Sequence, residues 1–122
     1  MNAERESSEP WYAVRCVFRT TENKPWGPTD LTAGTGAYEE RITLWRASSA
    51  DEAIARAELE ANEYAATLGN QYVDFAQAYH LSDLPADGAE VFSLIRYSSL
   101  QTDAYLDHFF DTGEERQQQS PE

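Results

Sequence analysis

Alternating apolar and polar side chains mark the first regular segment of the chain, residues 11–20, with the sequence WYAVRCVFRT. One parity of this segment carries Tyr12, Val14, Cys16 and Phe18. The other parity carries Trp11, Arg15 and Arg19. Because successive side chains of a β-strand point to opposite faces, the pattern predicts a strand that is buried on its apolar face only.

Residues 38–47 (YEERITLWRA) also alternate and predict a second strand, antiparallel to the first. Its predicted inward face holds Tyr38, Ile42 and Leu44. Glu40 shares that face, although burying an unpaired carboxylate costs on the order of several kcal/mol. We therefore expect Glu40 to lie at the rim of the sheet and to pair with an arginine of a neighbouring strand. The candidates are Arg15, Arg19 and Arg96.

A long helix is predicted between Ser49 and Gly69. Ser49 and Glu52 have the spacing of a capping box, in which the serine oxygen accepts a backbone amide and the glutamate reaches back to the cap. The stripe of apolar residues at three- and four-residue steps comprises Ala50, Ala53, Ile54, Ala57, Ala61, Tyr64, Ala65 and Leu68. Its small side chains allow the helix to lie close on a sheet. Gly69 and Asn70 are expected to end it.

The remaining segments predict two more strands and a second helix. Residues 72–81 alternate again, with one face formed by Val73, Phe75, Tyr79 and Leu81. Residues 84–88 (LPADG) have hairpin-turn chemistry, and the β-rich run at residues 89–97 (AEVFSLIRY) predicts a fourth strand. Thr102 is the expected cap of a short helix that continues to Phe110.

The order β-β-α-β-β-α predicts an α+β fold. It has about four antiparallel strands in one sheet, one long amphipathic helix on one face and a short C-terminal helix. The predicted domain spans residues 11–113. Residues 1–10 and 114–122 contain few apolar side chains and predict disordered tails. Residues 21–36 are dense in Pro, Gly, Thr and Asp, which predicts a long loop between the first two strands.

Charge narrows the class of partner. Among its 122 residues the chain has 9 Lys and Arg against 22 Asp and Glu, a formal net charge of -13. Such a field repels phosphate backbones and anionic lipids, so it argues against nucleic acid and membrane as direct ligands and favours a basic protein. A surface that only keeps the protein soluble is the alternative. One cysteine and no long apolar run predict a cytoplasmic protein.

Several segments, in order, resemble a family of short bacterial proteins known as domain-of-unknown-function family 4288. They are WYAVRCVF, YEERITLWRASSADEAIARAELEANEYA, AYHL, AEVFSLIR and YLDHFFDTGEER. The resemblance covers nearly all of residues 11–116. The family carries no established activity, so the resemblance implies no catalytic residue. Some small families of this kind resemble immunity proteins of bacterial toxin systems, which agrees with an acidic inhibitor only by association.

The sequence predicts no catalytic, cofactor-binding or metal-binding residue, and no cofactor. Cys16 shares the apolar face of its strand and is expected to be a buried, unreactive thiol. The two histidines, His80 and His108, lack the spacing that would place two metal ligands on one surface. None of the serines stands in a G-x-S-x-G motif.

Charged and aromatic side chains supply the candidates for a partner-binding surface. Charges of both signs lie at the start of the second strand, aspartates recur at four-residue steps on the last helix, and two tryptophans are possible anchors. These candidates are Trp26, Glu39, Glu40, Arg41, Trp45, Asp103, Asp107 and Asp111. Each has a structural alternative: an ion pair within the sheet for the charged run, a solvated helix face for the aspartates, and packing over the open side of the sheet for the tryptophans.

Three functions remain open at this point. The first is a non-enzymatic interaction protein, of which an immunity-type inhibitor is one form, that meets a basic protein through its negative field. The second is a small-molecule-binding domain or modest enzyme with Glu40, Arg96 and His80 gathered at the open face of the sheet. The third is self-association of the chain through that open face, which makes a homo-oligomer.

Overall fold

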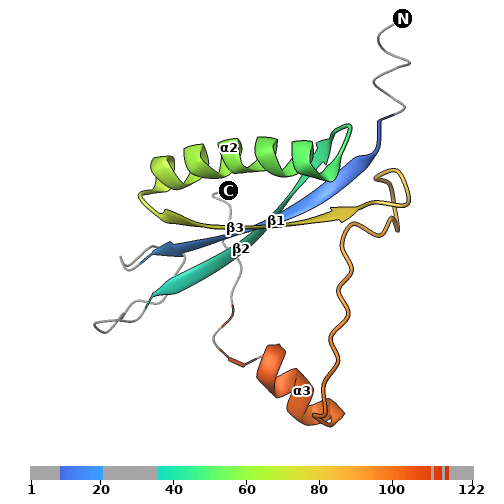
Figure 1. Cartoon of the computed structure of the whole chain (residues 1–122). Coiled ribbons are helices and arrows are strands. Elements are labelled where there is room, and N and C mark those ends of the chain that lie inside the picture. The colour runs from blue at the N-terminus through green and yellow to red at the C-terminus, as the bar shows by residue number, and fades with distance from the viewer. Residues whose placement is uncertain (1–8, 21–35, 111, 114, 116–122) are drawn as a thin grey trace, which may run out of the picture.

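The computed structural model describes residues 9–20, 36–110, 112–113 and 115. Its elements are β1 (Trp11–Thr20), β2 (Ala37–Arg46), α2 (Ala50–Leu68), β3 (Gln71–His80) and α3 (Thr102–Phe109). The strands form one antiparallel sheet in the order β2-β1-β3, and α2 lies across one of its faces (Figure 1). The α+β class is therefore confirmed. Most of the predicted tails and of the predicted loop at residues 21–36 lie outside the described residues.

β1 is the central strand, and its predicted inward face is confirmed. Val14 and Phe18 are the largest fully buried side chains, and Tyr12 and Cys16 are buried beside them. Burial of a Val or Phe side chain contributes about 1.5–3 kcal/mol. β1, which has the most continuous apolar face, thus lies between the other two strands of the sheet.

α2 begins and ends close to where the sequence predicts. The Ser49 hydroxyl accepts the Glu52 backbone N–H at 3.1 Å. The Glu52 carboxylate reaches past the cap residue to accept both the backbone N–H and the hydroxyl of Ser48 at 2.6 Å. These hydrogen bonds lower the pKa of Glu52. At the other end Gly69 has φ 71, and Asn70 N–H closes back on the last turn at 2.9 Å.

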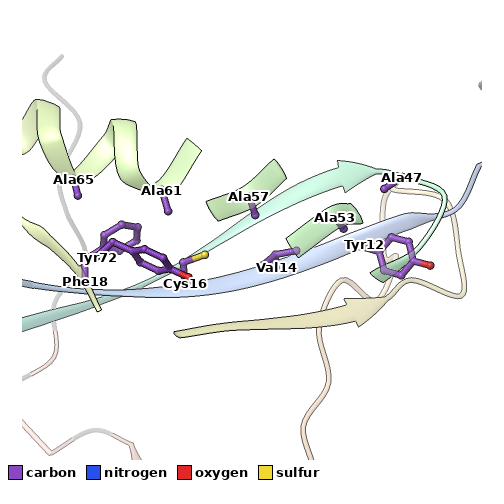
Figure 2. Close-up of a cluster of buried hydrophobic side chains, with 10 residues drawn as sticks. All are labelled: Tyr12, Val14, Cys16, Phe18, Ala47, Ala53, Ala57, Ala61, Ala65 and Tyr72. Carbon is purple, nitrogen blue, oxygen red and sulfur yellow. The ribbon is translucent and has the colours of Figure 1, made fainter. Parts of the chain in front are cut away.

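The predicted alanine stripe forms the contact between helix and sheet. Figure 2 shows the methyl groups pointing from α2 toward the side chains of β1 and β3. The buried residues of the helix are Ala53, Ala57, Ala61 and Ala65, none more than 5% exposed. Small side chains on the helix leave room for larger ones on the sheet, among them Phe18 and Tyr72. The core is thus asymmetric, with its bulk supplied by the strands.

The predicted inward face of β2 is wrong. The pairing places Tyr12 opposite Trp45 and Val14 opposite Thr43, so the odd-numbered side chains of β2 face α2. Those on the face away from α2, called the open face below, include Tyr38, Ile42 and Leu44, which are 64%, 44% and 41% exposed. Antiparallel partners share a face, and β1 commits its continuous apolar face to the core. The register of β1 therefore overrides the weaker apolar pattern of β2.

An irregularity in β3 changes which of its residues reach the core. The register with β1 shifts between Cys16 and Phe18, and Asp74 takes a left-handed conformation with φ 61. Asp tolerates this conformation better than most residues. The bulge brings Tyr72 opposite Phe18 on the helix side, whereas Phe75 remains 48% exposed. Of the predicted face formed by Val73, Phe75, Tyr79 and Leu81, only Leu81 is buried, and Tyr72 joins it in the core.

The fourth strand, expected over residues 89–97, is not formed. A turn closes with Ala89 N–H donating to the Ala86 carbonyl at 3.0 Å, after which the chain runs away from the sheet toward α3 (Figure 1). We call residues 89–110 the arm. Its helix is capped by Gln101 rather than by Thr102, which is its first residue, and ends at Phe109. α3 contacts none of the other elements that the structure describes.

Candidate protein-interaction surface

Two of the predicted partner-binding residues are engaged with α2. The Arg41 guanidinium donates to both carboxylate oxygens of Glu60, at 2.7 and 2.9 Å. It also lies 3.8 Å from the centre of the Tyr64 ring, a cation–π contact. The Tyr64 hydroxyl in turn contacts both carboxylate oxygens of Glu39 at 2.9 Å. We call Glu39, Arg41, Glu60 and Tyr64 the seam cluster, because it closes the margin between β2 and α2.

The seam cluster shifts the pKa of two of its members. The hydrogen bond to Glu60 is the main cause that raises the pKa of Arg41. Burial, and then the hydrogen bond to Glu39, raise the pKa of Tyr64 to about 12. The phenol is therefore neutral at physiological pH and serves as a hydrogen-bond donor to a carboxylate. Charged residues that the sequence singles out for a partner are thus arranged here to hold a helix on a sheet.

A second tyrosine links the core to a glutamate of α2. The Tyr72 hydroxyl donates to Glu58 at 2.7 Å, and burial is the main cause that raises the pKa of Tyr72. Burial likewise raises the pKa of the free Cys16 thiol, which is 4% exposed. A buried thiol whose pKa is raised stays protonated at neutral pH and is a poor nucleophile. Cys16 therefore acts as a small core side chain.

Glu40 lies on the open face and pairs with Arg15, one of the three predicted arginines. The Arg15 guanidinium contacts the Glu40 carboxylate at 3.3 Å, and the Glu40 side chain is 63% exposed. Arg15 also donates to Gln77 at 2.6 Å and lies 4.9 Å from the centre of the Phe92 ring. Glu40 therefore remains accessible at the surface, and its carboxylate is partly neutralised.

The two predicted tryptophan anchors have different outcomes. Trp45 is half-buried on the helix side of β2, packed against the core. Its indole N–H donates to Thr43 at 2.7 Å, and the Arg56 guanidinium lies 5.3 Å from the centre of its ring. It therefore does not cover the open side of the sheet. Trp26 lies outside the described residues.

The acidic stripe of the last helix is exposed where the structure describes it. Asp103 and Asp107 are both exposed on α3, and Asp111 lies outside the described residues. Arg96, which precedes α3 in the chain, contacts two aromatic residues of that helix. Its guanidinium donates to the Tyr105 hydroxyl at 3.2 Å and lies 4.1 Å from the centre of the Phe109 ring. Arg96 therefore fastens residues 89–100 to α3 within the arm.

The structure does not bring together the residues of the second hypothesis. Glu40 pairs with Arg15 on the open face. His80 lies on the helix side of the sheet, with its ring centre 5.1 Å from that of Tyr12. Arg96 is held in the arm. Within the described ranges, no group of three or more His, Cys, Asp and Glu residues has a geometry that could hold a metal ion.

Exposed charged side chains of the described residues are mostly carboxylates. Each arginine of the described residues contacts an acceptor or an aromatic ring of the protein itself; these are Arg15, Arg19, Arg41, Arg46, Arg56 and Arg96. Many carboxylates are instead exposed, among them Asp51, Glu63, Asp83, Asp87, Asp103 and Asp107. Among the described residues, the exposed charge is therefore mostly negative.

Two features differ from what the sequence patterns predict: the apolar side chains on the open face and the course of residues 89–97 in the arm. The open face carries Tyr38, Ile42 and Leu44, which the pattern of β2 predicts to be in the core. Within the arm, the sequence predicts a fourth strand at residues 89–97, which the structure does not form, and a short helix, which it does form. The sequence of β2 does contain a signal for the observed orientation. Thr43 and Trp45 make the opposite face nearly as apolar as the predicted inward face.

Comparisons with family models, curated proteins and solved structures found no match to this chain. Neither of the two described helices has the length and apolar character that crossing a membrane requires.

Proposed function

We propose that this protein is an acidic, non-enzymatic interaction module that binds a basic protein. The observation that carries the proposal is the distribution of charge just described: each arginine of the described residues contacts a group of the protein itself, whereas many carboxylates remain exposed. A surface with one sign of charge attracts an oppositely charged protein and accelerates its association. The net charge of -13 has the same sign as this surface.

An inhibitor of the immunity type, acting on a basic bacterial toxin in the cytoplasm, is the narrower form of the proposal. Its support is the acidity of the chain, together with the resemblance to family 4288 that we propose. Of the residues predicted to meet a partner, Asp103 and Asp107 are the exposed acidic pair, one turn apart on α3. We propose this pair as the site where the partner makes its closest charged contacts.

The test is capture of a basic protein from the cytoplasm of the source cells by immobilised full-length chain. At about 0.05 M salt the screening length exceeds 10 Å, and near 0.5 M it falls below 5 Å. We expect a basic protein to be retained at low salt and released at high salt. Retention that is unchanged at high salt, or capture of only acidic proteins, would contradict electrostatic recognition.

Two matched variants then locate the contact. Asp103→Asn with Asp107→Asn should weaken capture, because it removes two carboxylates from the proposed site. Asp51→Asn with Glu63→Gln removes the same charge from exposed positions on α2 and should have a smaller effect. Equal losses in the two variants would show that the partner responds to total charge and not to a site on α3.

A further inference from the structure

The arm exposes large apolar side chains that the described part of the chain leaves uncovered. They include Leu94, Ile95, Tyr97, Leu100, Leu106 and Phe110, of which Ile95 is 78% and Tyr97 97% exposed. α3 has eight residues, none of them buried, and contacts no other described element. Isolated helices shorter than about 12 residues are marginal in water. Packing against the arm by something other than the described residues would therefore stabilise α3.

The open face of the sheet is the second uncovered apolar surface of the same chain. Tyr38, Ile42, Leu44 and Phe75 are each more than 40% exposed on it. The beginning of the arm already touches this face, because the Phe92 ring centre lies 5.8 Å from that of Tyr79 and the Tyr79 hydroxyl is hydrogen-bonded to Glu90. Beyond Phe92 the arm continues on the open-face side of the sheet, away from α2 (Figure 1).

The size of these two surfaces fits a protein dimer. At roughly 150–250 Å² for a large side chain, the exposed fractions of the arm and the open face together amount to on the order of 1,000 Å². A typical monomer exposes an apolar patch of about 300–600 Å². A standard protein interface buries about 800 Å² on each partner. The uncovered area is thus what one protomer contributes to a stable dimer.

We propose that a second copy of this chain covers both surfaces, with the arm of each copy lying on the open face of the other. Both complementary surfaces occur on every copy, so a twofold dimer forms the same contact twice and leaves neither surface uncovered. The charges on the open face permit this contact between two acidic chains. Arg15, Arg19 and Arg46 lie on the open face with Glu40, so this face is not acidic although the chain is. The dimer proposal rests on apolar side chains and does not require that the basic partner proposed above exists.

Sedimentation equilibrium of the full-length chain, over about 1 to 100 μM, tests the proposal. We expect a mass that approaches twice 13.8 kDa as the concentration rises. Ile95→Glu in the arm and Ile42→Glu on the open face should each return the mass to 13.8 kDa at concentrations where the unchanged chain is dimeric. The matched control is Leu59→Glu, which alters a 71% exposed leucine on α2 and should leave the dimer intact.

Mixing the two monomeric variants distinguishes exchange of arms from any other contact. A heterodimer of Ile95→Glu with Ile42→Glu contains one unaltered arm on one unaltered open face, so we expect a dimer to reappear in the mixture. A contact between two open faces, without the arms, would gain nothing from mixing. Circular dichroism of each variant confirms that it is folded.

Three results would overturn the proposal. One is a mass of 13.8 kDa for the unchanged chain at every concentration, whether the arm folds on its own sheet or binds another protein. Another is a dimer that survives Ile95→Glu. The third is a mixture that stays monomeric although both variants are folded.

Discussion

At the scale of single residues, the charged side chains of Glu39 and Arg41 on the edge strand β2 stabilise its packing against α2. Arg41 joins Glu60 by two hydrogen bonds and lies on the ring of Tyr64, which is bonded to Glu39. Charge-assisted, two-point contacts of this kind are stronger than ordinary surface ion pairs because their geometry is fixed. The seam cluster therefore holds the margin of α2 where alanines alone contribute little area.

Glu60→Ala should lower the free energy of unfolding by about 1–2 kcal/mol, because it removes two charge-assisted hydrogen bonds from Arg41. Urea unfolding at neutral pH measures the change. Glu63→Ala is the control, since Glu63 is exposed on the same helix, and its effect should stay within about 0.5 kcal/mol. Equal effects of the two substitutions would show that the seam cluster is not stabilising.

The raised pKa of Tyr64 predicts a loss of stability in alkali. An unfolded tyrosine titrates near its ordinary pKa of 10.0, whereas the folded one holds its proton up to about 12. The stabilisation is therefore complete below pH 10 and is lost as the pH rises toward 12. Urea unfolding across this range should show a decline that Tyr64→Phe makes shallower. Tyr97→Phe, at a position 97% exposed, should leave the decline unchanged, and a Tyr64→Phe curve parallel to the unchanged protein would contradict the assignment.

At the scale of elements, α2 and β1 are specified by agreement between local and tertiary signals. The cap at Ser49, the alanine stripe and the left-handed Gly69 define the helix from its sequence, and tertiary packing uses the same stripe. α3 and residues 89–97 lack this agreement. Their apolar side chains follow regular patterns, yet α3 contacts no other described element, and Leu94, Ile95 and Tyr97 remain exposed.

Ala57→Leu should destabilise the protein by about 1–3 kcal/mol, because the methyl group of Ala57 is 1% exposed against the sheet and a larger side chain must displace α2. Thermal or urea unfolding followed by circular dichroism measures the change. Ala55→Leu places the same side chain on the exposed side of the same helix and should be close to neutral. A neutral Ala57→Leu would mean that the helix does not lie as close to the sheet as the structure shows.

At the scale of the whole molecule, charge and apolar surface are distributed differently. Exposed carboxylates occur on α2 and along the arm, whereas uncovered apolar side chains concentrate on the open face and the arm. A net charge of -13 attracts a basic protein and repels a second copy of the chain. The two proposed associations therefore respond to salt in opposite directions.

Raising salt from about 0.05 M to 0.5 M should tighten the dimer and weaken the complex with a basic protein, because screening reduces repulsion in the first and attraction in the second. Sedimentation at the two salt concentrations measures the dimer, and capture at the same concentrations measures the complex. A dimer that weakens with salt would show that ion pairs, and not the apolar surfaces of arm and open face, hold it together.

The sequence by itself determined the elements whose signals are local. The strand at residues 11–20 and the helix between Ser49 and Gly69 follow from side-chain periodicity and from capping, which act over a few residues. It also determined the sign of the charge, and it predicted the pairing of Glu40 with an arginine.

Only the tertiary structure decided the rest. Which face of β2 is buried depends on its register with β1, and a shift of one residue exchanges the two faces at no cost to the local pattern. The bulge at Asp74 decides that Tyr72 enters the core. Whether residues 89–97 form a strand depends on whether another strand presents free hydrogen-bonding groups to them, and a periodic sequence carries no information about the position of its partner.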